Sequence, residues 1–298
     1  MSIVLLAPDV DRARQLPALL TVEGEYGDYV WTGRAYTAAH HQRTGPYVGR
    51  HLHDGGRPAP CNDPNIPLLP FGVIGVSHLD LDTYGGLFRA DPVRRETHFC
   101  PDLDAFWALA ERVDVIGPHR LETLSPDAGL RRQIRAFWAW NQTQLRLAPD
   151  RVVDVTEKVN MAGVVLLSIF TEDPLLMAAA DDLWEGEQNL NRASFVHAEL
   201  GVALRHSDGP FVNALYTTPG GDLLDGVVAW NRGTGEVTVS VADPGVDCRA
   251  LVRTLWGPNA GGHLQIAGSP RGLRLGFHEA DRAVAALRRE LHTLRSVG

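Results

Sequence analysis

The sequence is short of lysine, of cysteine pairs and of long apolar runs, and each shortage excludes a class of protein. Its 298 residues include one lysine, Lys158, which excludes a P-loop and a Schiff-base enzyme, because both need a lysine in the site. Three widely spaced cysteines, Cys61, Cys100 and Cys248, form no Cys-x-x-Cys pattern, so neither a disulfide framework nor a structural zinc module is indicated. We therefore expect a protein of the reducing cytoplasm.

The sequence also has no excess of basic residues over acidic ones. The formal net charge is −8 and the pI is about 5.8, which argues against a surface that wraps long nucleic acid, whereas a small anionic ligand in a local pocket fits. The longest apolar run, residues 161–170, is about half of a membrane span, and the first residues lack a basic leader. We expect a cytoplasmic protein with no membrane or long nucleic-acid partner, and a homodimer stays open.

Hydrophobic periodicity predicts two domains that differ in character. We expect an α/β domain with a mostly parallel sheet over residues 1–180, and a smaller α+β domain over residues 181–298, with an active-site cleft between them. The expected strands of the first domain are 3–6, 28–37, 70–77 and 113–116, and its expected helices are 11–20, 84–90, 102–112 and 129–145. In the second domain we expect helices at 192–206, 247–256 and 279–296, and strands at 211–216, 225–230, 236–241 and 273–277.

The segment Gly75–Gly86, GVSHLDLDTYGG, carries the strongest chemical signal. If the preceding strand continues through it, His78, Asp80 and Asp82 alternate and share one face of the strand. One imidazole and two carboxylates are suitable ligands for a divalent ion such as Mn²⁺ or Mg²⁺. The alternative is structural: the segment caps the next helix, with Asp82 or Thr83 as the N-cap.

Further candidate ligands lie where other predicted strands end. His40, His41 and Asp114 could reach the same edge of the sheet as the first three ligands. His119 is a candidate ligand or general acid, and Asp80, His41 and His119 are the candidates for catalysis. Mn²⁺ is the cofactor that we expect, with Mg²⁺, Zn²⁺ and Fe²⁺ as alternatives.

A second candidate site is the segment 256–263, WGPNAGGH. Glycines let a backbone approach a ligand closely and present N–H groups to an anion, and a neighbouring histidine adds a donor. Gly261, Gly262 and His263 are therefore predicted to bind the substrate's anionic group. An ordinary glycine turn between a helix and a strand is the alternative.

Together the two segments resemble a known family, the DHH-type phosphoesterases. Ser77–Asp82 and the glycine pair after it resemble the first metal motif of that family. The runs at 239–241, 246–248, 261–263 and 267–268 are similar to its C-terminal, DHH-associated substrate-binding domain. The resemblance implies metals on the first domain and a substrate phosphate held by the second, across the cleft.

The chain departs from the family pattern in three places. The Asp-His-His motif is absent downstream of residue 82, where residues 113–120 read VDVIGPHR; the pair His40-His41 lies upstream after Ala39; and Ala242-Asp243 stand where the family often has an arginine. The first hypothesis is that the protein is a metal-dependent hydrolase of a small phosphorylated, nucleotide-like substrate. The alternatives are a repurposed biosynthetic metalloenzyme acting on another small anion, and a non-catalytic nucleotide-binding module.

Overall fold

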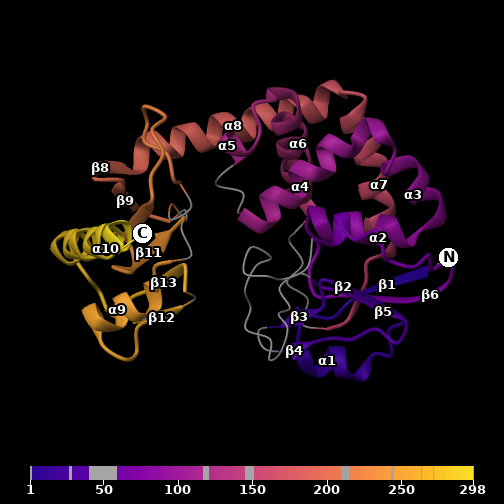
Figure 1. Ribbon diagram of the computed structural model, residues 1–298, viewed down its shortest axis with the longest axis horizontal. Helices are drawn as coiled ribbons and strands as arrows, with labels where there is room; N and C mark the ends of the chain where they lie inside the picture. Colours follow the sequence, from indigo (N-terminus) through magenta and orange to yellow (C-terminus); the bar gives the residue numbers. More distant parts are fainter. Residues whose placement is uncertain are drawn as a thin grey trace. The chain divides into compact units, whose positions relative to one another are not determined.

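The computed structural model describes residues 2–26, 29–39, 59–116, 121–144, 151–209, 212, 215–242, 245–262, 264–270 and 272–297. Residue contacts divide the chain into two compact units, Met1–Trp184 and Glu185–Gly298 (Figure 1). A five-stranded sheet lies in the first unit and a six-stranded sheet in the second. The fold class is mixed α/β with mixed sheets, while the functional assignment of each unit and the cleft stay predictions.

The sheet of the first unit is mostly parallel. Its strand order is β5-β2-β6-β1-β7, and only the edge pair β1/β7 is antiparallel. The strands are β1 (Ser2–Leu6), β2 (Leu20–Val22), β5 (Tyr36–Ala38), β6 (Gly72–Val76) and β7 (Val153–Asp154), and a separate hairpin pairs β3 (Glu25–Tyr26) with β4 (Tyr29–Val30). Continuous apolar strands of this kind are typical of a parallel sheet covered on both faces.

Helices cover both faces of this sheet. Figure 1 shows α1 (Val10–Gln15) on one side, and α2 (Leu81–Ala90), α4 (Asp104–Ile116), α6 (Ala128–Gln144) and α7 (Thr156–Phe170) on the other. The larger core therefore lies on the α2 side and includes Ile74, Phe88, Trp107, Phe137 and Leu166. The remaining helical segments are η2 (Pro60–Asn62), α3 (Pro92–His98), η3 (Pro101–Leu103), α5 (Leu121–Leu124) and α8 (Pro174–Ser194), which runs across the division between the units.

Two glycines let α2 pack closely against its neighbours. A Cβ added at Gly85 would lie 2.4 Å from Cys61 Cβ in η2, and one added at Gly86 would lie 2.7 Å from Val22 Cγ1 in β2. The glycine pair that follows the resemblance to the metal motif is thus in the middle of a helix. Close packing of α2 against its neighbours explains why both positions are glycine.

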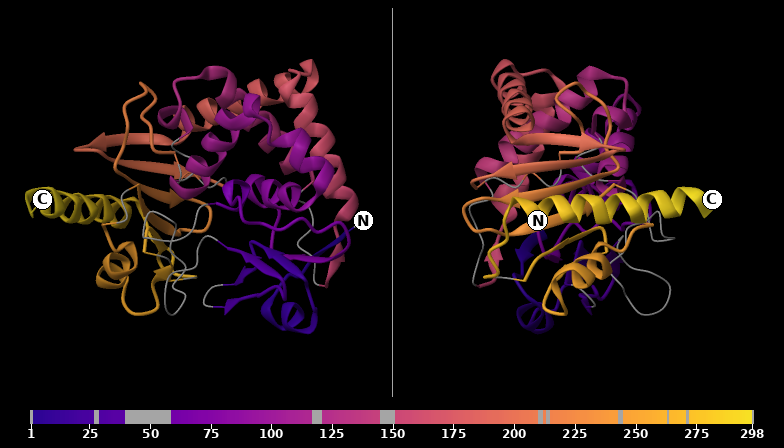
Figure 2. Two further views of the ribbon diagram at one scale, coloured as in Figure 1. Left: turned by 45° about the vertical axis from the view of Figure 1, so that its right-hand side comes forward. Right: turned by 90° about the vertical axis from the view of Figure 1, so that its left-hand side faces the viewer.

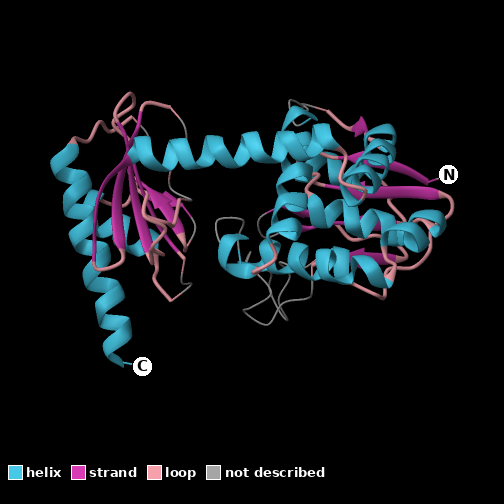
Figure 3. Cartoon of the chain, turned by 90° about the horizontal axis from the view of Figure 1, so that it is seen from above, coloured by secondary structure: helices cyan, strands magenta, loops and turns pink. Residues whose placement is uncertain are grey.

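The second unit is a mixed sheet with two helices on one face. Its strand order is β12-β13-β11-β10-β9-β8, and only β9 and β10 are parallel. The strands are β8 (Phe195–Glu199), β9 (Val202–Ser207), β10 (Gly226–Asn231), β11 (Val237–Val241), β12 (Gly261–Gly262) and β13 (Ile266–Gly268). Figures 2 and 3 show α10 (Phe277–Val297) lying along the sheet, and its apolar side shares a core with α9 (Cys248–Trp256).

A buried arginine joins the end of α8 to the segment before β10. The Arg205 guanidinium donates to the carbonyls of Asn191, Leu215 and Thr217, and to the side-chain oxygens of Asn191 and Ser194. Burial lowers the pKa of Arg205 to about 10. Because its hydrogen bonds are all made within the second unit, we assign Arg205 a structural role.

Several expected elements are wrong. The expected strand 28–37 is interrupted, because the chain folds tightly at Gly33, where a Cβ would lie 2.2 Å from the Tyr36 carbonyl oxygen. The expected helix 192–206 is the end of α8 followed by the β8–β9 hairpin, which turns at Leu200 and Gly201 with positive φ. Residues 273–276 form no strand. Of the expected strand 211–216, residues 211, 213 and 214 lie outside the described residues, and residues 212, 215 and 216 form no strand.

Among the described helices, none is by itself long and apolar enough to cross a bilayer. The pair α7 and α8, bent by 88°, passes the same test of length and composition when both helices are taken together.

Candidate functional site

Three neighbouring parallel strands end at the same edge of the first sheet. Val22 pairs in register with Ala38 on one side and with Val76 on the other, so β5, β2 and β6 terminate side by side. Glu23 follows β2, and the segment Ser77–Asp80 follows β6. The carboxyl edge of a parallel sheet is the usual place for a ligand site in α/β proteins.

The β6–α2 connection is a short loop. Strand β6 ends at Val76, and Asp80 is the N-cap of α2, with its Oδ1 accepting hydrogen bonds from the Thr83 N–H and hydroxyl. The shared strand face predicted for His78, Asp80 and Asp82 is therefore wrong. The capping alternative is right in kind, but the cap is Asp80, and neither Asp82 nor Thr83. Capping does not explain Asp82, which is only 2 % exposed in the first turn of α2.

A third carboxylate approaches this loop from α4. One carboxylate oxygen each of Asp80, Asp82 and Asp114 lies within 4.8 Å of the other two, an arrangement that could hold a metal ion. The strand expected around Asp114 is wrong, since helix α4 continues to Ile116 with Phe106, Ala110 and Val113 buried at helical spacing. A carboxylate in the last turn of a helix opposes the helix dipole, so local stability does not favour Asp114 there.

The pKa values of Asp82 and Asp80 shift in opposite directions. Burial, followed by the charges of Asp80, Asp114 and Glu23, raises the pKa of Asp82 well above its usual range. Burial also opposes ionisation of Asp80, but the charge and hydrogen bond of His78 outweigh it and lower the pKa of that carboxyl. Asp82 is the buried member of the three, and carboxylates at this spacing favour either a shared proton or a bound cation.

His78 is paired with Asp80. Its Nε2 lies 3.0 Å from Asp80 Oδ2, and its Nδ1 lies 2.8 Å from Ser77 Oγ. The Ser77 hydroxyl donates to the Glu23 carbonyl, so its oxygen can accept from the Nδ1 N–H of His78, and the charged form of the ring directs its second proton, on Nε2, at Asp80. Partial burial opposes this charge, but the Asp80 and Glu23 carboxylates outweigh it and raise the pKa of His78 to about 9.

Two acidic residues near the site were missed in the sequence. Glu23 and Glu25 both contribute to the raised pKa of His78, and Glu23 is fully buried with a φ of 50°. A non-glycine residue held at positive φ at a sheet edge is a strained position of the kind found at functional sites. The sequence does contain a pattern that could have identified them. In residues 19–25, LLTVEGE, an apolar run is followed by acidic residues, as it is in residues 73–82.

The donor set fits a hard divalent cation. Three carboxylates at mutual distances within 4.8 Å offer the oxygen ligands that Mn²⁺ and Mg²⁺ prefer. His78 is placed beside this group as a partner of Asp80, so the structure gathers Asp80, Asp82 and Asp114 and keeps the imidazole next to them.

The remaining predicted site residues fall into two groups. His40, His41, His119 and His263 lie outside the described residues. Gly261 and Gly262 form β12 and pair with β13, in register with Gly268 and Ala267. The predicted anion-binding glycine turn is therefore a short edge strand, and its substrate role stays a prediction.

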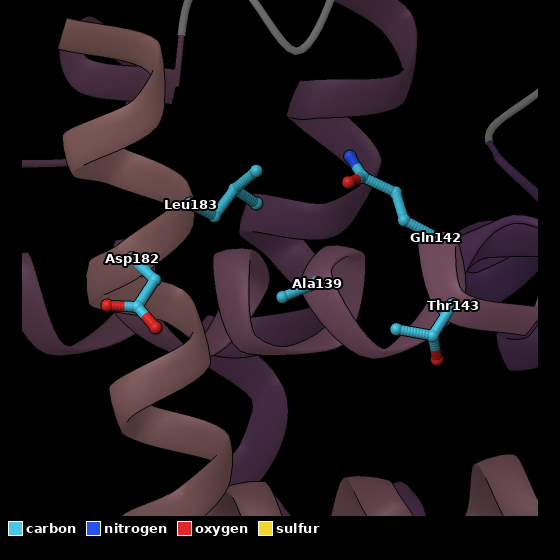
Figure 4. A pocket seen from close by; sticks show the side chains of 5 residues that line it. All are labelled: Ala139, Gln142, Thr143, Asp182 and Leu183. Carbon is cyan, nitrogen blue, oxygen red and sulfur yellow. The ribbon is translucent and has the colours of Figure 1, made fainter. Parts of the chain in front are cut away.

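A groove elsewhere in the first unit does not coincide with the carboxylates. It measures about 520 Å³ and lies between α6 and α8, lined by Ala139, Gln142, Thr143, Asp182 and Leu183 (Figure 4). With a single carboxylate in its lining, it lacks the donor set of the acidic site.

Comparisons with known proteins do not identify the chain. No model of a protein family matches it, and no curated protein matches it either. A crystal structure of an uncharacterized protein from Helicobacter pylori G27 is similar at a TM-score of 0.22 and 16 % identity, over 74 % of this chain and 74 % of that chain. A similarity of this size carries no argument about function.

Proposed function

We propose that the protein is a metal-dependent hydrolase of a small phosphorylated, nucleotide-like substrate, with its metal held by Asp80, Asp82 and Asp114. One observation carries the proposal: three carboxylates from two helices lie within 4.8 Å of one another beside the carboxyl edge of a parallel sheet. A divalent cation would stabilise carboxylates that are gathered in this way. The bound metal would neutralise phosphate charge and lower the pKa of a bound water.

The chain's own residues supply the proton chemistry. In phosphoester hydrolysis, water takes the place of the leaving oxygen on phosphorus, and that oxygen needs a proton. His78 holds one at Nε2 against Asp80, and Ser77 orients the ring from the other side. His78 is half exposed, at 48 % of its side chain, so solvent and a substrate can reach it. We assign it the role of proton donor to the leaving group.

The proposal is tested with variants of two N-cap residues, Asp80 and Asp91. Asp80→Asn keeps an N-cap on α2 but removes a charge, because asparagine caps helices as well as aspartate does. Asp91→Ala removes the equivalent cap of α3, where Asp91 accepts from the Arg94 N–H at 2.9 Å. Mn²⁺ binding is measured by calorimetry, and hydrolysis is measured with bis-p-nitrophenyl phosphate and short dinucleotides.

Asp80→Asn should lose Mn²⁺ binding and hydrolysis together, whereas Asp91→Ala should lose only stability, by about 1 kcal/mol. Wild-type protein that binds no divalent metal would contradict the proposal and favour a nucleotide-binding module. Metal binding without hydrolysis of any phosphorylated compound would favour the repurposed biosynthetic enzyme.

A further inference from the structure

Asn141 reaches the backbone of the acidic site from a helix remote in sequence. It lies on α6 and is 5 % exposed, and its Nδ2 donates a hydrogen bond of 3.2 Å to the carbonyl oxygen of Leu79. Leu79 stands between His78 and Asp80, and its own side chain is buried. A single amide thus holds the peptide group that precedes the N-cap of α2.

An amide is unexpected at this position of α6. Asn141 follows Ile134 by seven residues and Phe137 by four, so it belongs to the buried stripe that these two residues form. Within the described part of the chain, its Oδ1 has no hydrogen-bond partner. Burying an amide whose oxygen is unsatisfied costs free energy, and leucine would suit the stripe better. The hydrogen bond to Leu79 is the compensating contact.

The loop has anchors at its two ends as well. Ser77 donates its N–H and its hydroxyl to the Glu23 carbonyl, and Thr83 donates to Asp80 Oδ1. Neither contact fixes the peptide between Leu79 and Asp80, whose rotation would swing the Asp80 side chain. Asn141 holds that peptide.

We propose that Asn141 is a positioning residue, which orients the His78–Asp80 segment so that the Asp80 carboxylate faces those of Asp82 and Asp114. This inference rests on the proposed function, because the geometry that it maintains is that of the metal site. Partners of metal ligands in the surrounding shell typically change metal affinity by 10–100-fold when they are replaced.

The test compares variants at two positions of the same helix face. Asn141→Leu fills a similar volume without the donor, and Asn141→Ser serves as a second variant should leucine prevent folding. Ile134→Val removes one methylene from the same stripe and changes no hydrogen-bonding group. For each protein, Mn²⁺ affinity is measured by calorimetry, and hydrogen exchange of residues 77–83 is measured without metal.

We expect at least a tenfold loss of Mn²⁺ affinity in the Asn141 variants, with faster exchange at residues 77–83, and less than a twofold change in Ile134→Val. Unchanged affinity in Asn141→Leu, or an equal loss in Ile134→Val, would overturn the positioning role. If wild type binds no Mn²⁺, the proposed function fails. Exchange that still rises only in the Asn141 variants would then support the positioning role, and unchanged exchange would overturn it too.

Discussion

Asp82 is a carboxylate placed where folding alone does not favour it. Because folding raises its pKa, ionising this carboxyl opposes folding, so metal-free stability falls as the pH rises above the ordinary carboxyl pKa. Asp82→Asn should therefore raise the metal-free free energy of unfolding at neutral pH by about 0.5–2 kcal/mol and abolish Mn²⁺ binding. Urea unfolding from pH 4 to 8, with and without Mn²⁺, measures both. A variant that is destabilised without metal would show that the ionised carboxylate stabilises the fold.

At the scale of secondary-structure elements, two glycines within helices differ in the space around them. Gly85 in α2 has Cys61 against it, whereas a Cβ at Gly186 in α8 would meet nothing within 4 Å. Gly186→Ala should raise the free energy of unfolding by about 0.5–1 kcal/mol, since only helix propensity changes. Gly85→Ala should lower it by about 1–3 kcal/mol through overpacking. Denaturant unfolding of both variants checks this contrast, and equal effects would contradict the packing explanation for α2.

At the scale of the whole molecule, each compact unit has its own sheet and its own hydrophobic core. The three site aspartates all belong to the first unit. Mn²⁺ at 100 times its dissociation constant should stabilise that unit by about 2.7 kcal/mol and leave the second unit unchanged. Hydrogen exchange monitored at β6 and at β10, with Mn²⁺ and with EDTA, separates the two. Equal protection of both strands by the metal would show that the units unfold together.

Local chemistry in the sequence predicted a good part of this protein. The apolar run before His78, the α/β alternation and the helices around residues 84–90, 102–112, 247–256 and 279–296 were all recognisable, because strand and helix periods depend on nearby residues. The same local reasoning selected Asp80, Asp82 and Asp114 as candidates by residue type and position after apolar runs. It misjudged where the β6 strand stops, because the N-cap hydrogen bond of Asp80 begins a helix within the motif.

Only the tertiary structure decided which candidates meet. Asp114 was expected on a strand and reaches the other two aspartates from a helix, because the packing of α4 against α2 and η2 sets the direction of its side chains. Glu23 joins the site through the register of β2 with β6, and Asn141 joins it through the packing of α6 beside the loop. Both are long-range contacts, and neither segment has a sequence pattern that predicts its partner. The sequence therefore shows which residues could take part in a site, whereas the packing of distant elements decides which of them come together.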